Sequence, residues 1–225
     1  MDASLWIAKT GLTAQQTRMS VISNNLANVN TTGFKKDRAV FEDLLYQNIV
    51  PAGGQIDAES ETPTGLMLGT GTRVVATEKL HGQGNIITTE NALDLAISGD
   101  GYFSVQQADG TIAYSRDGSF KLSADGSLVT AGGQAVLPAI TVPQNAASLT
   151  IGRDGIVTVE LANGGGSSQI GQLQLSRFVN NSGLQPIGRN LLQQTNASGD
   201  PLVALPGADG AGQLMQGALE ASNVN

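Results

Sequence analysis

The chain has 225 residues, of which 14% are charged, 4% are aromatic and 29 are glycine. Its 19 acidic and 12 basic residues give a formal net charge of −7, which excludes nucleic acid as an expected partner. The absence of cysteine excludes disulfides and cysteine-ligated zinc. No apolar run approaches the roughly 18 residues that span a bilayer, and the N-terminus lacks a cleavable signal pattern, so we expect no membrane insertion.

Residues 4–28 carry an apolar pattern with a helical period. One row recurs every seven residues and a second row follows it by three; they are Leu5, Leu12, Met19 and Leu26, and then Ala8, Gln15, Ile22 and Val29. We predict a helix that ends where residues 28–33 compete with the helix backbone and Gly33 can adopt positive φ. So narrow an apolar stripe needs partner helices, unless the helix lies on a domain of its own chain.

Residues 34–90 are expected to connect this helix with a β-domain. Residues 36–49 fit either a short amphipathic helix or one arm of a long hairpin that returns over residues 72–80, and the sequence leaves both open. Residues 53–71 are predicted to form an extended or weakly ordered loop, whose length indicates a functional role. Three apolar residues make a local patch in it, namely Leu66, Met67 and Leu68.

From residue 91 onward, glycine-rich turns and short apolar runs predict β structure. Asp-Gly steps supply the positive φ that tight hairpin turns need; they fall at residues 100–101, 109–110, 117–118, 125–126 and 154–155. The expected strands are 102–107 with 111–115, 120–122 with 128–130, 148–151 with 156–161, and one continuous strand over 169–179. Residues 180–217 carry few strand signals and are interpreted as a return path.

No residue pattern predicts catalysis or a bound cofactor. His81 lies in a polar, glycine-rich stretch, and a lone histidine without cysteine does not form an ordinary structural zinc site. The acidic positions Asp125, Asp154 and Asp209 lack the alternating spacing, closed by a glutamate, of a calcium loop. The glycine clusters neither follow a strand nor open a helix, as a nucleotide loop would. We therefore expect no catalytic residue, metal or cofactor, and no enzyme activity.

The segment SNNLANVNTTGFK, residues 23–35, resembles the N-terminal signature of bacterial flagellar rod and hook proteins. The resemblance continues in blocks at residues 38–47, 69–74, 95–103, 114–120 and 217–225, which are more similar to the distal rod than to the hook. It implies that the N-terminal helix packs beside a C-terminal helix in the inner tube of a hollow helical filament, with β-domains packed laterally outside. Because the sequence stops at Asn225, we expect the family's C-terminal helix to be missing.

The resemblance implies a structural subunit of the distal rod, a hollow drive shaft that transmits torque. The expected place is the flagellar basal body, in its periplasm-spanning rod, reached through the flagellar type III apparatus without a cleaved signal peptide. Implied partners are copies of the chain itself, proximal rod subunits, the hook protein and surrounding ring proteins. The alternatives are a hook or proximal rod subunit, or a secreted carbohydrate- or surface-binding β-module, which the small number of aromatic residues disfavours.

The sequence thus predicts a mainly β, elongated protein with an N-terminal α-helix. The expected parts are an assembly helix over 1–33, a connector over 34–90, a β-domain over 91–180 and a return segment over 181–225. Asparagine amides near the end of the helix can form hydrogen bonds between neighbours in a polymer. The expected assembly interface comprises Leu5, Leu12, Met19, Ile22, Asn24, Asn25, Leu26, Asn28, Phe34, Leu66, Met67 and Leu68.

Overall fold

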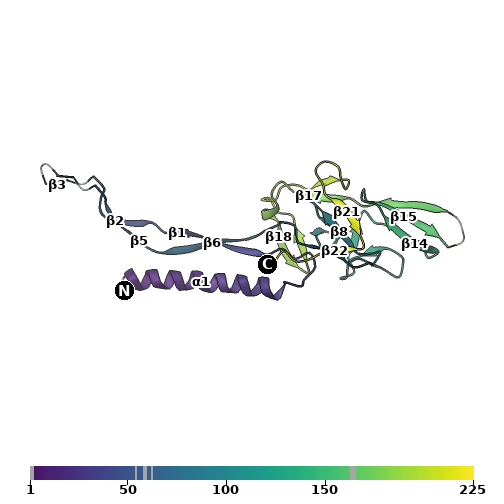
Figure 1. The fold of residues 1–225 in the computed structure, drawn as a ribbon, viewed down its shortest axis with the longest axis horizontal. Coiled ribbons are helices and arrows are strands. Elements are labelled where there is room, and N and C mark those ends of the chain that lie inside the picture. Colours follow the sequence, from purple (N-terminus) through teal and green to yellow (C-terminus); the bar gives the residue numbers. More distant parts are fainter. Residues whose placement is uncertain (1–2, 54, 58–59, 62, 163–165) are drawn as a thin grey trace. The chain divides into compact units, whose positions relative to one another are not determined.

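The computed structural model describes residues 3–53, 55–57, 60–61, 63–162 and 166–225. These contain one α-helix, at the N-terminus, and are otherwise mainly β, which confirms the predicted fold class (Figure 1). In chain order the elements are α1 (Ala3–Ala27), β1 (Asp37–Asp43), β2 (Tyr46–Val50), β3 (Gln55–Asp57), β4 (Ser60–Glu61), β5 (Leu66–Gly69), β6 (Thr72–Lys79), β7 (Ile86–Thr88), β8 (Leu95–Ser98), β9 (Phe103–Gln106), β10 (Ile112–Ser115), β11 (Lys121–Leu122), β12 (Leu128–Val129), β13 (Ala135–Leu137), β14 (Ala146–Ile151), β15 (Ile156–Leu161), β16 (Ser167–Gln172), β17 (Leu175–Arg177), a 3-10 turn (Asn181–Gly183), β18 (Gln185–Gly188), β19 (Leu191–Gln193), β20 (Leu202–Ala204), β21 (Gln213–Gln216) and β22 (Ala218–Glu220).

The chain divides into two compact units, which we describe separately. The first comprises Met1–Leu26 and Asp37–Lys79, and the second comprises Ala27–Lys36 and Leu80–Asn225. The chain therefore passes from one unit to the other at three points in the sequence, after residues 26, 36 and 79.

In the first unit, residues 36–49 adopt the hairpin alternative. Strand β1 pairs antiparallel with β6, from Asp37 opposite Lys79 to Asp43 opposite Thr72. Strand β2 pairs in the same way with β5. Cross-strand ion pairs, such as Lys79 Nζ to Asp37 Oδ1 at 2.9 Å, support the β1–β6 register.

The segment 53–71, expected to be an extended or weakly ordered loop, is extended in its described part and contains the short strands β3, β4 and β5, so it is not a loop throughout. Residues 54, 58–59 and 62 of that segment lie outside the described residues.

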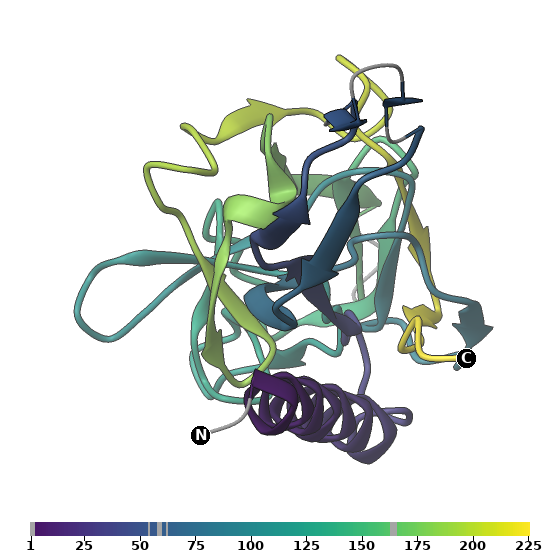
Figure 2. The ribbon, with the colours of Figure 1, turned by 90° about the vertical axis from the view of Figure 1, so that its left-hand side faces the viewer.

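Helix α1 lies along this hairpin and runs opposite to β1 (Figures 1 and 2). At one end, the backbone N–H of Thr72 donates to Thr10 Oγ1 at 3.4 Å. At the other, the Asn25 side chain bonds both backbone groups of Asp37. Fifteen helical residues rise about 22 Å, and the six steps of β1 from Asp43 to Asp37 span about 20 Å. The matched lengths let the helix be held at Thr10 and at Asn25 at once.

The second unit buries the main apolar core. Its largest sheet has the order β11-β12-β13-β9-β10-β19-β18, and a three-stranded sheet has the order β14-β15-β16. Smaller pairs join β17 with β20, β21 with β8 and β22 with β7. Phe103 and Phe120 meet edge to face with ring centroids 4.9 Å apart inside this core.

Several predicted strand pairs are confirmed, and two expectations were wrong. The confirmed pairs are β9 with β10, β11 with β12 and β14 with β15. The continuous strand expected over 169–179 is broken into β16 and β17, with Leu173 buried between them. Residues 180–217, expected to carry few strand signals, contain β18 to β21. These strands are only three or four residues long, which is too short for an apolar alternation to mark them in the sequence.

The Asp-Gly steps also divide into two kinds. Gly101, Gly110, Gly126 and Gly155 have positive φ. Gly118 does not; a Cβ added there would lie 1.7 Å from the Leu95 carbonyl oxygen. This glycine is needed for close approach to β8 and not for a hairpin turn.

We expect Gly118→Ala to lower the free energy of unfolding by roughly 1–3 kcal/mol or more, because the added methyl group meets the backbone of a buried strand. Urea unfolding followed by circular dichroism measures the loss. Gly82→Ala is the matched control, since a Cβ at Gly82 would meet nothing within 4 Å. Equal stability of the two variants would contradict this role for Gly118.

Candidate assembly surfaces and the buried ion triad

Helix α1 has two faces of different chemistry. The face turned toward the β1–β6 hairpin is small and polar, and its half-buried or buried members are Thr10, Ala14, Thr17, Val21 and Asn25. The apolar stripe is exposed, with Leu12 at 72% and Leu26 at 68%, and Met19 and Ile22 at half or more. At about 100° per residue the two faces lie on roughly opposite sides of the helix. The apolar stripe therefore faces away from the β1–β6 hairpin and is not buried by it.

The three asparagines expected at the interface differ in their surroundings. Asn25 Oδ1 accepts the Asp37 N–H and Asn25 Nδ2 donates to the Asp37 carbonyl, both at 2.8 Å. Asn28 Oδ1 accepts from the Thr31 hydroxyl at 3.2 Å, and Asn24 lies on the exposed surface. Asn25 thus holds α1 to its own hairpin, a role that its sequence position did not predict.

The β2–β5 ribbon carries a second apolar surface. Leu66, Met67 and Leu68 are each about half exposed. Successive strand residues point to opposite faces, so Met67 and Leu68 make the ribbon apolar on both sides. The Tyr46 ring covers Gly69, with its Cε1 3.5 Å from where a glycine Cβ would stand. A two-stranded ribbon is marginally stable in water, so this patch requires cover from elsewhere.

In the second unit, the segment that follows α1 is held by a buried ion triad. Glu220 Oε1 accepts Lys35 Nζ at 2.6 Å, and Glu220 Oε2 accepts Arg116 Nε at 2.8 Å. The Gly84 N–H also donates to Glu220 Oε1 at 2.8 Å. The side chains are almost fully buried, with exposures of 3% for Lys35, 5% for Arg116 and 0% for Glu220.

Backbone carbonyl groups also accept hydrogen bonds from the two cations of the triad. Arg116 Nη1 donates to the carbonyls of Gly99 and Gly101, and Lys35 Nζ donates to that of Gly82. Burial alone raises the pKa of the Glu220 carboxyl, but Arg116 and Lys35 outweigh it and hold that pKa below its usual range. Burial lowers the pKa of Lys35 despite the nearby carboxylate. The carboxylate is therefore ionised between two cations.

Backbone contacts fix the same segment on the β core. The Gly33 N–H donates to the Glu220 carbonyl at 2.8 Å, and Gly33 has the predicted positive φ of 67°. A Cβ at Gly33 would lie 2.7 Å from the Asp117 nitrogen, so only glycine fits. The Asn190 side chain donates to the Thr32 carbonyl at 3.1 Å. Phe34, expected at the assembly interface, is half-buried beside these contacts.

The triad could not be predicted from the sequence. Its members lie inside the blocks that carry the family resemblance, but the pairs are separated by 185 and 104 positions along the chain. No local period links residues so far apart. A charged residue in an otherwise apolar strand, as Glu220 is in β22, was the available signal.

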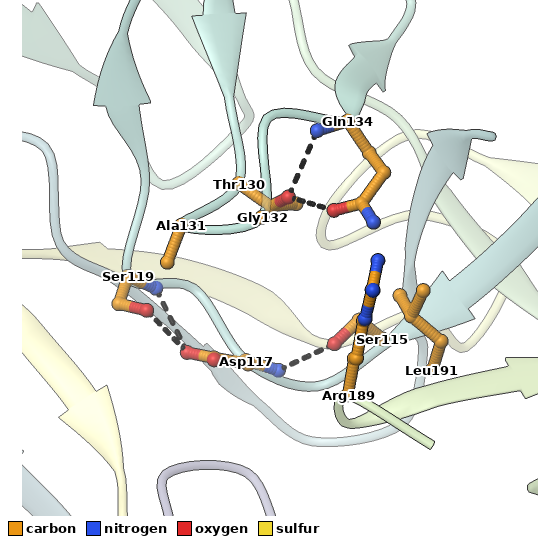
Figure 3. A pocket seen from close by; sticks show the side chains of 9 residues that line it. All are labelled: Ser115, Asp117, Ser119, Thr130, Ala131, Gly132, Gln134, Arg189 and Leu191. Atoms are coloured by element: carbon orange, nitrogen blue, oxygen red, sulfur yellow. Dashed lines mark hydrogen bonds between the residues drawn. The ribbon is translucent and has the colours of Figure 1, made fainter. Parts of the chain in front are cut away.

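A small polar cavity of about 60 Å³ lies in the second unit (Figure 3). Asp117 Oδ1 accepts from the backbone and side chain of Ser119, Thr130 pairs with Gln134, and the Arg189 side chain extends toward Gln134. This volume has room for a few water molecules at most and is well below that of an ordinary substrate pocket.

His81 is half-buried, and its Nδ1 lies 2.8 Å from the Tyr102 hydroxyl. Among the described residues, no cluster of three or more histidine, aspartate or glutamate side chains is placed to bind a metal ion. Within the described part of the chain, no helix has the length and apolar character needed to cross a membrane.

A folded β unit joined to a helix and ribbon with uncovered apolar surfaces defines a class of protein, the subunit of a larger assembly. Comparison with known families agrees. The family described as flagella basal body rod protein matches residues 5–35, and that described as flagellar hook protein FlgE/F/G D1 domain matches residues 96–159.

Relatives match over the full chain. The flagellar basal-body rod protein FlgG of Buchnera aphidicola subsp. Schizaphis graminum is 54% identical over 225 residues, and that of Borreliella burgdorferi is 45% identical over 227 residues. Each match covers 100% of this chain and 86% of the relative. The flagellar hook protein FlgE of Helicobacter pylori is 43% identical over 137 residues, which cover 60% of this chain and 19% of that protein. The chain belongs to the flagellar basal-body rod protein family.

We expect Asn25→Ala to loosen α1 from the hairpin, because it removes two hydrogen bonds worth about 1–3 kcal/mol together. Hydrogen exchange should show faster exchange along α1 and at the Asp37 amide. Gln16→Ala, on the exposed side of the same helix, is the control. If Asn25→Ala leaves protection of α1 at its original level, the amide does not hold the helix.

The lowered pKa of Glu220 makes stability depend on acidity. The unfolded carboxyl takes up a proton at higher pH than the folded one, so this stabilisation is complete above the ordinary value of 4.5 and is lost as pH falls below it. Urea midpoints measured from pH 7 to pH 3 should fall for the original chain. The Glu220→Gln chain should lack this component, and parallel curves for the two would contradict the assignment.

Proposed function

We propose that the protein is a structural subunit of the flagellar basal-body distal rod, which polymerises into a hollow helical shaft and transmits torque. The observation that carries this is the exposed apolar stripe of α1, whose opposite face is occupied by its own hairpin. Identical subunits joined by contacts that do not close on themselves produce a helical filament. The stripe residues Leu5, Leu12, Met19, Ile22 and Leu26 would be buried between subunits in its inner tube.

The distal rod is favoured over the hook because of the extent of similarity. Rod relatives match the whole chain, whereas the hook relative matches 60% of it. The exposed ribbon residues Leu66, Met67 and Leu68 give the subunit a second surface for neighbours. The proposal includes an assembly helix over residues 1–33, a connector over 34–90, a β-domain over 91–180 and a return segment over 181–225. In it the protein acts by packing and catalyses no reaction.

The remaining contacts follow from the same proposal. Copies of the chain are the main partner, and proximal rod subunits, the hook protein and ring proteins adjoin the ends and the outer surface of the shaft. The rod lies in the periplasm, and the subunit reaches it through the flagellar export apparatus without cleavage of a signal peptide. Asn24, Asn28 and Phe34 stay in the proposed interface, and Asn25 is left out because both the oxygen and the nitrogen of its side-chain amide bond the Asp37 backbone.

Negative-stain electron microscopy of concentrated protein tests polymerisation directly. Helical filaments of uniform diameter are the expected result. A protein that remains monomeric at millimolar concentration, or that forms only closed rings, would contradict the proposed function.

We expect Met19→Asp or Ile22→Asp to abolish filaments, because a charge buried at each interface costs about 2–5 kcal/mol. Melting of the second unit should hardly change. Ser20→Asp introduces the same charge on the same helix outside the stripe and should leave assembly intact. Loss of filaments in all three variants would point to helix unfolding, and intact filaments in the stripe variants would remove the stripe from the interface.

The ribbon patch gives a prediction about stiffness. Docked on adjacent subunits, the patch would limit the sliding that bending requires. Replacing Leu66, Met67 and Leu68 with serine should leave the fold and filament formation intact but shorten the persistence length seen by electron microscopy. Gln47→Ser, opposite Leu68 on β2, is the control. Straight filaments of unchanged persistence length would exclude a mechanical role for the patch.

A further inference from the structure

The β1–β6 hairpin carries two cross-strand ion pairs on its exposed surface. Arg38 pairs with Glu78 near one end of the hairpin, and Arg73 pairs with Glu42 near the other. The four side chains keep between 31% and 63% of their surface exposed, so another molecule can reach them. Isolated exposed ion pairs contribute little to stability, so the fold of the subunit does not account for these charges.

A β-bulge places all four charges on one face of the hairpin. Arg38 and Glu42 are four residues apart on β1 and share a face, but Glu78 and Arg73 are five apart on β6 and would point to opposite faces of a regular strand. The register shifts by one residue at Val75, which has no partner in β1. The shift turns Arg73 to the side of Glu78, and the two ion pairs therefore share one face.

The charges alternate in sign across this face. Strand β1 presents a cation and then an anion, Arg38 and Glu42, whereas β6 presents an anion and then a cation at the same levels, Glu78 and Arg73. The two outer edges of the hairpin are therefore complementary to each other at two levels, which lie about 13 Å apart along the strands. In the described part of the chain this sheet contains β1 and β6 only, so both edges are open.

Each ion pair also leaves hydrogen-bonding capacity unused. Two nitrogens of Arg38, Nε and Nη2, donate to the same oxygen of Glu78, and the Arg73 guanidinium likewise donates to one oxygen of Glu42. Oε2 of each glutamate is left without a hydrogen bond within the described residues. Because a carboxylate has two accepting oxygens and a guanidinium has five N–H groups, each pair can take a further partner without breaking.

We propose that the β1–β6 hairpins of neighbouring copies pack side by side in the same direction, with β1 of one copy against β6 of the next. Arg38 then meets Glu78 of the next copy at one level. Glu42 meets Arg73 of that copy at the other level. Each edge is thus occupied by a second copy of the chain, and the inference rests on the proposed function.

The direction of packing follows from the kind of assembly. Contact between β1 and β6 is head-to-tail and does not close on itself, as a helical filament requires. The same charges also match a copy turned end for end, with β1 against β1. That contact would close into a dimer and could not continue along a filament.

An exchange of all four charges tests the contact in the full chain. The exchanged chain carries Arg38→Glu, Glu42→Arg, Arg73→Glu and Glu78→Arg, so both ion pairs inside the hairpin are kept with opposite polarity. It should melt like the original chain and form filaments by itself. In a mixture, each hairpin edge of one chain would face like charges on the other, so the two chains should form separate filaments.

Energy transfer between dyes measures this sorting. Donor and acceptor dyes are attached to a cysteine introduced at the exposed turn residue Asn196, and the original chain labelled with either dye gives the reference. Transfer between original and exchanged chains should be weaker than the reference by about threefold or more. Equal transfer, or an exchanged chain that melts like the original but forms no filaments, would overturn this inference alone. Absence of filaments from the original chain would overturn the proposed function and this inference with it.

A second measurement leaves the four charges intact and determines the direction of the contact. Val40 in β1 and Ala76 in β6 lie opposite each other between the two ion pairs, and the chain has no cysteine. Filaments that contain both Val40→Cys and Ala76→Cys subunits should give covalent dimers with a short bismaleimide cross-linker, and filaments of either variant alone should not. Dimers from either variant alone would show the end-for-end contact, and an unlinked mixture would show no contact; both results contradict the proposed packing.

Discussion

The carboxylate of Glu220 is the interaction on which the arrangement of the second unit depends. It lies between two buried cations, one on the segment that follows α1 and one in the β core. Replacing such a triad by apolar residues often costs nothing in other proteins, whereas removing one partner is strongly destabilising. The triad therefore contributes more to defining which segments meet than to total stability. It fixes the segment after the helix on a core of ordinary aromatic and aliphatic packing.

The two faces of α1 have different roles: one contacts the hairpin of its own chain, and the other is exposed. Thr10 and Asn25 hold the helix on its hairpin through polar contacts at both ends, and small residues between them allow close approach. The large apolar side chains are thereby left for other subunits. Because the stripe is largely exposed, it contributes little to the stability of the isolated chain. A subunit of this kind can be fully folded and still present an assembly surface.

The helix, the apolar stripe and three strand pairs were predictable because each rests on a local period or a turn signal. The hairpin over residues 36–49 was not predictable, because Val40 and Phe41 fit either an amphipathic helix or a strand. Only the pairing of β1 with β6 decides between them. The Arg189–Asn190 turn escaped prediction because it uses two non-glycine residues with positive φ, at 54° and 59°. The triad and the Asn25 bonds depend on long-range contacts, which periodicity does not contain.

The apolar stripe of α1 is exposed in the subunit, and in the proposed function it is buried in the filament. Because the chain has no cysteine, a single Leu12→Cys variant reports on this position alone. The rate of thiol labelling, measured first in the monomer and then in assembled filaments, tests the claim most directly. We expect rapid labelling in the monomer and a loss of at least tenfold in rate on assembly. Slow labelling of the monomer, or an equal rate in both states, would contradict it.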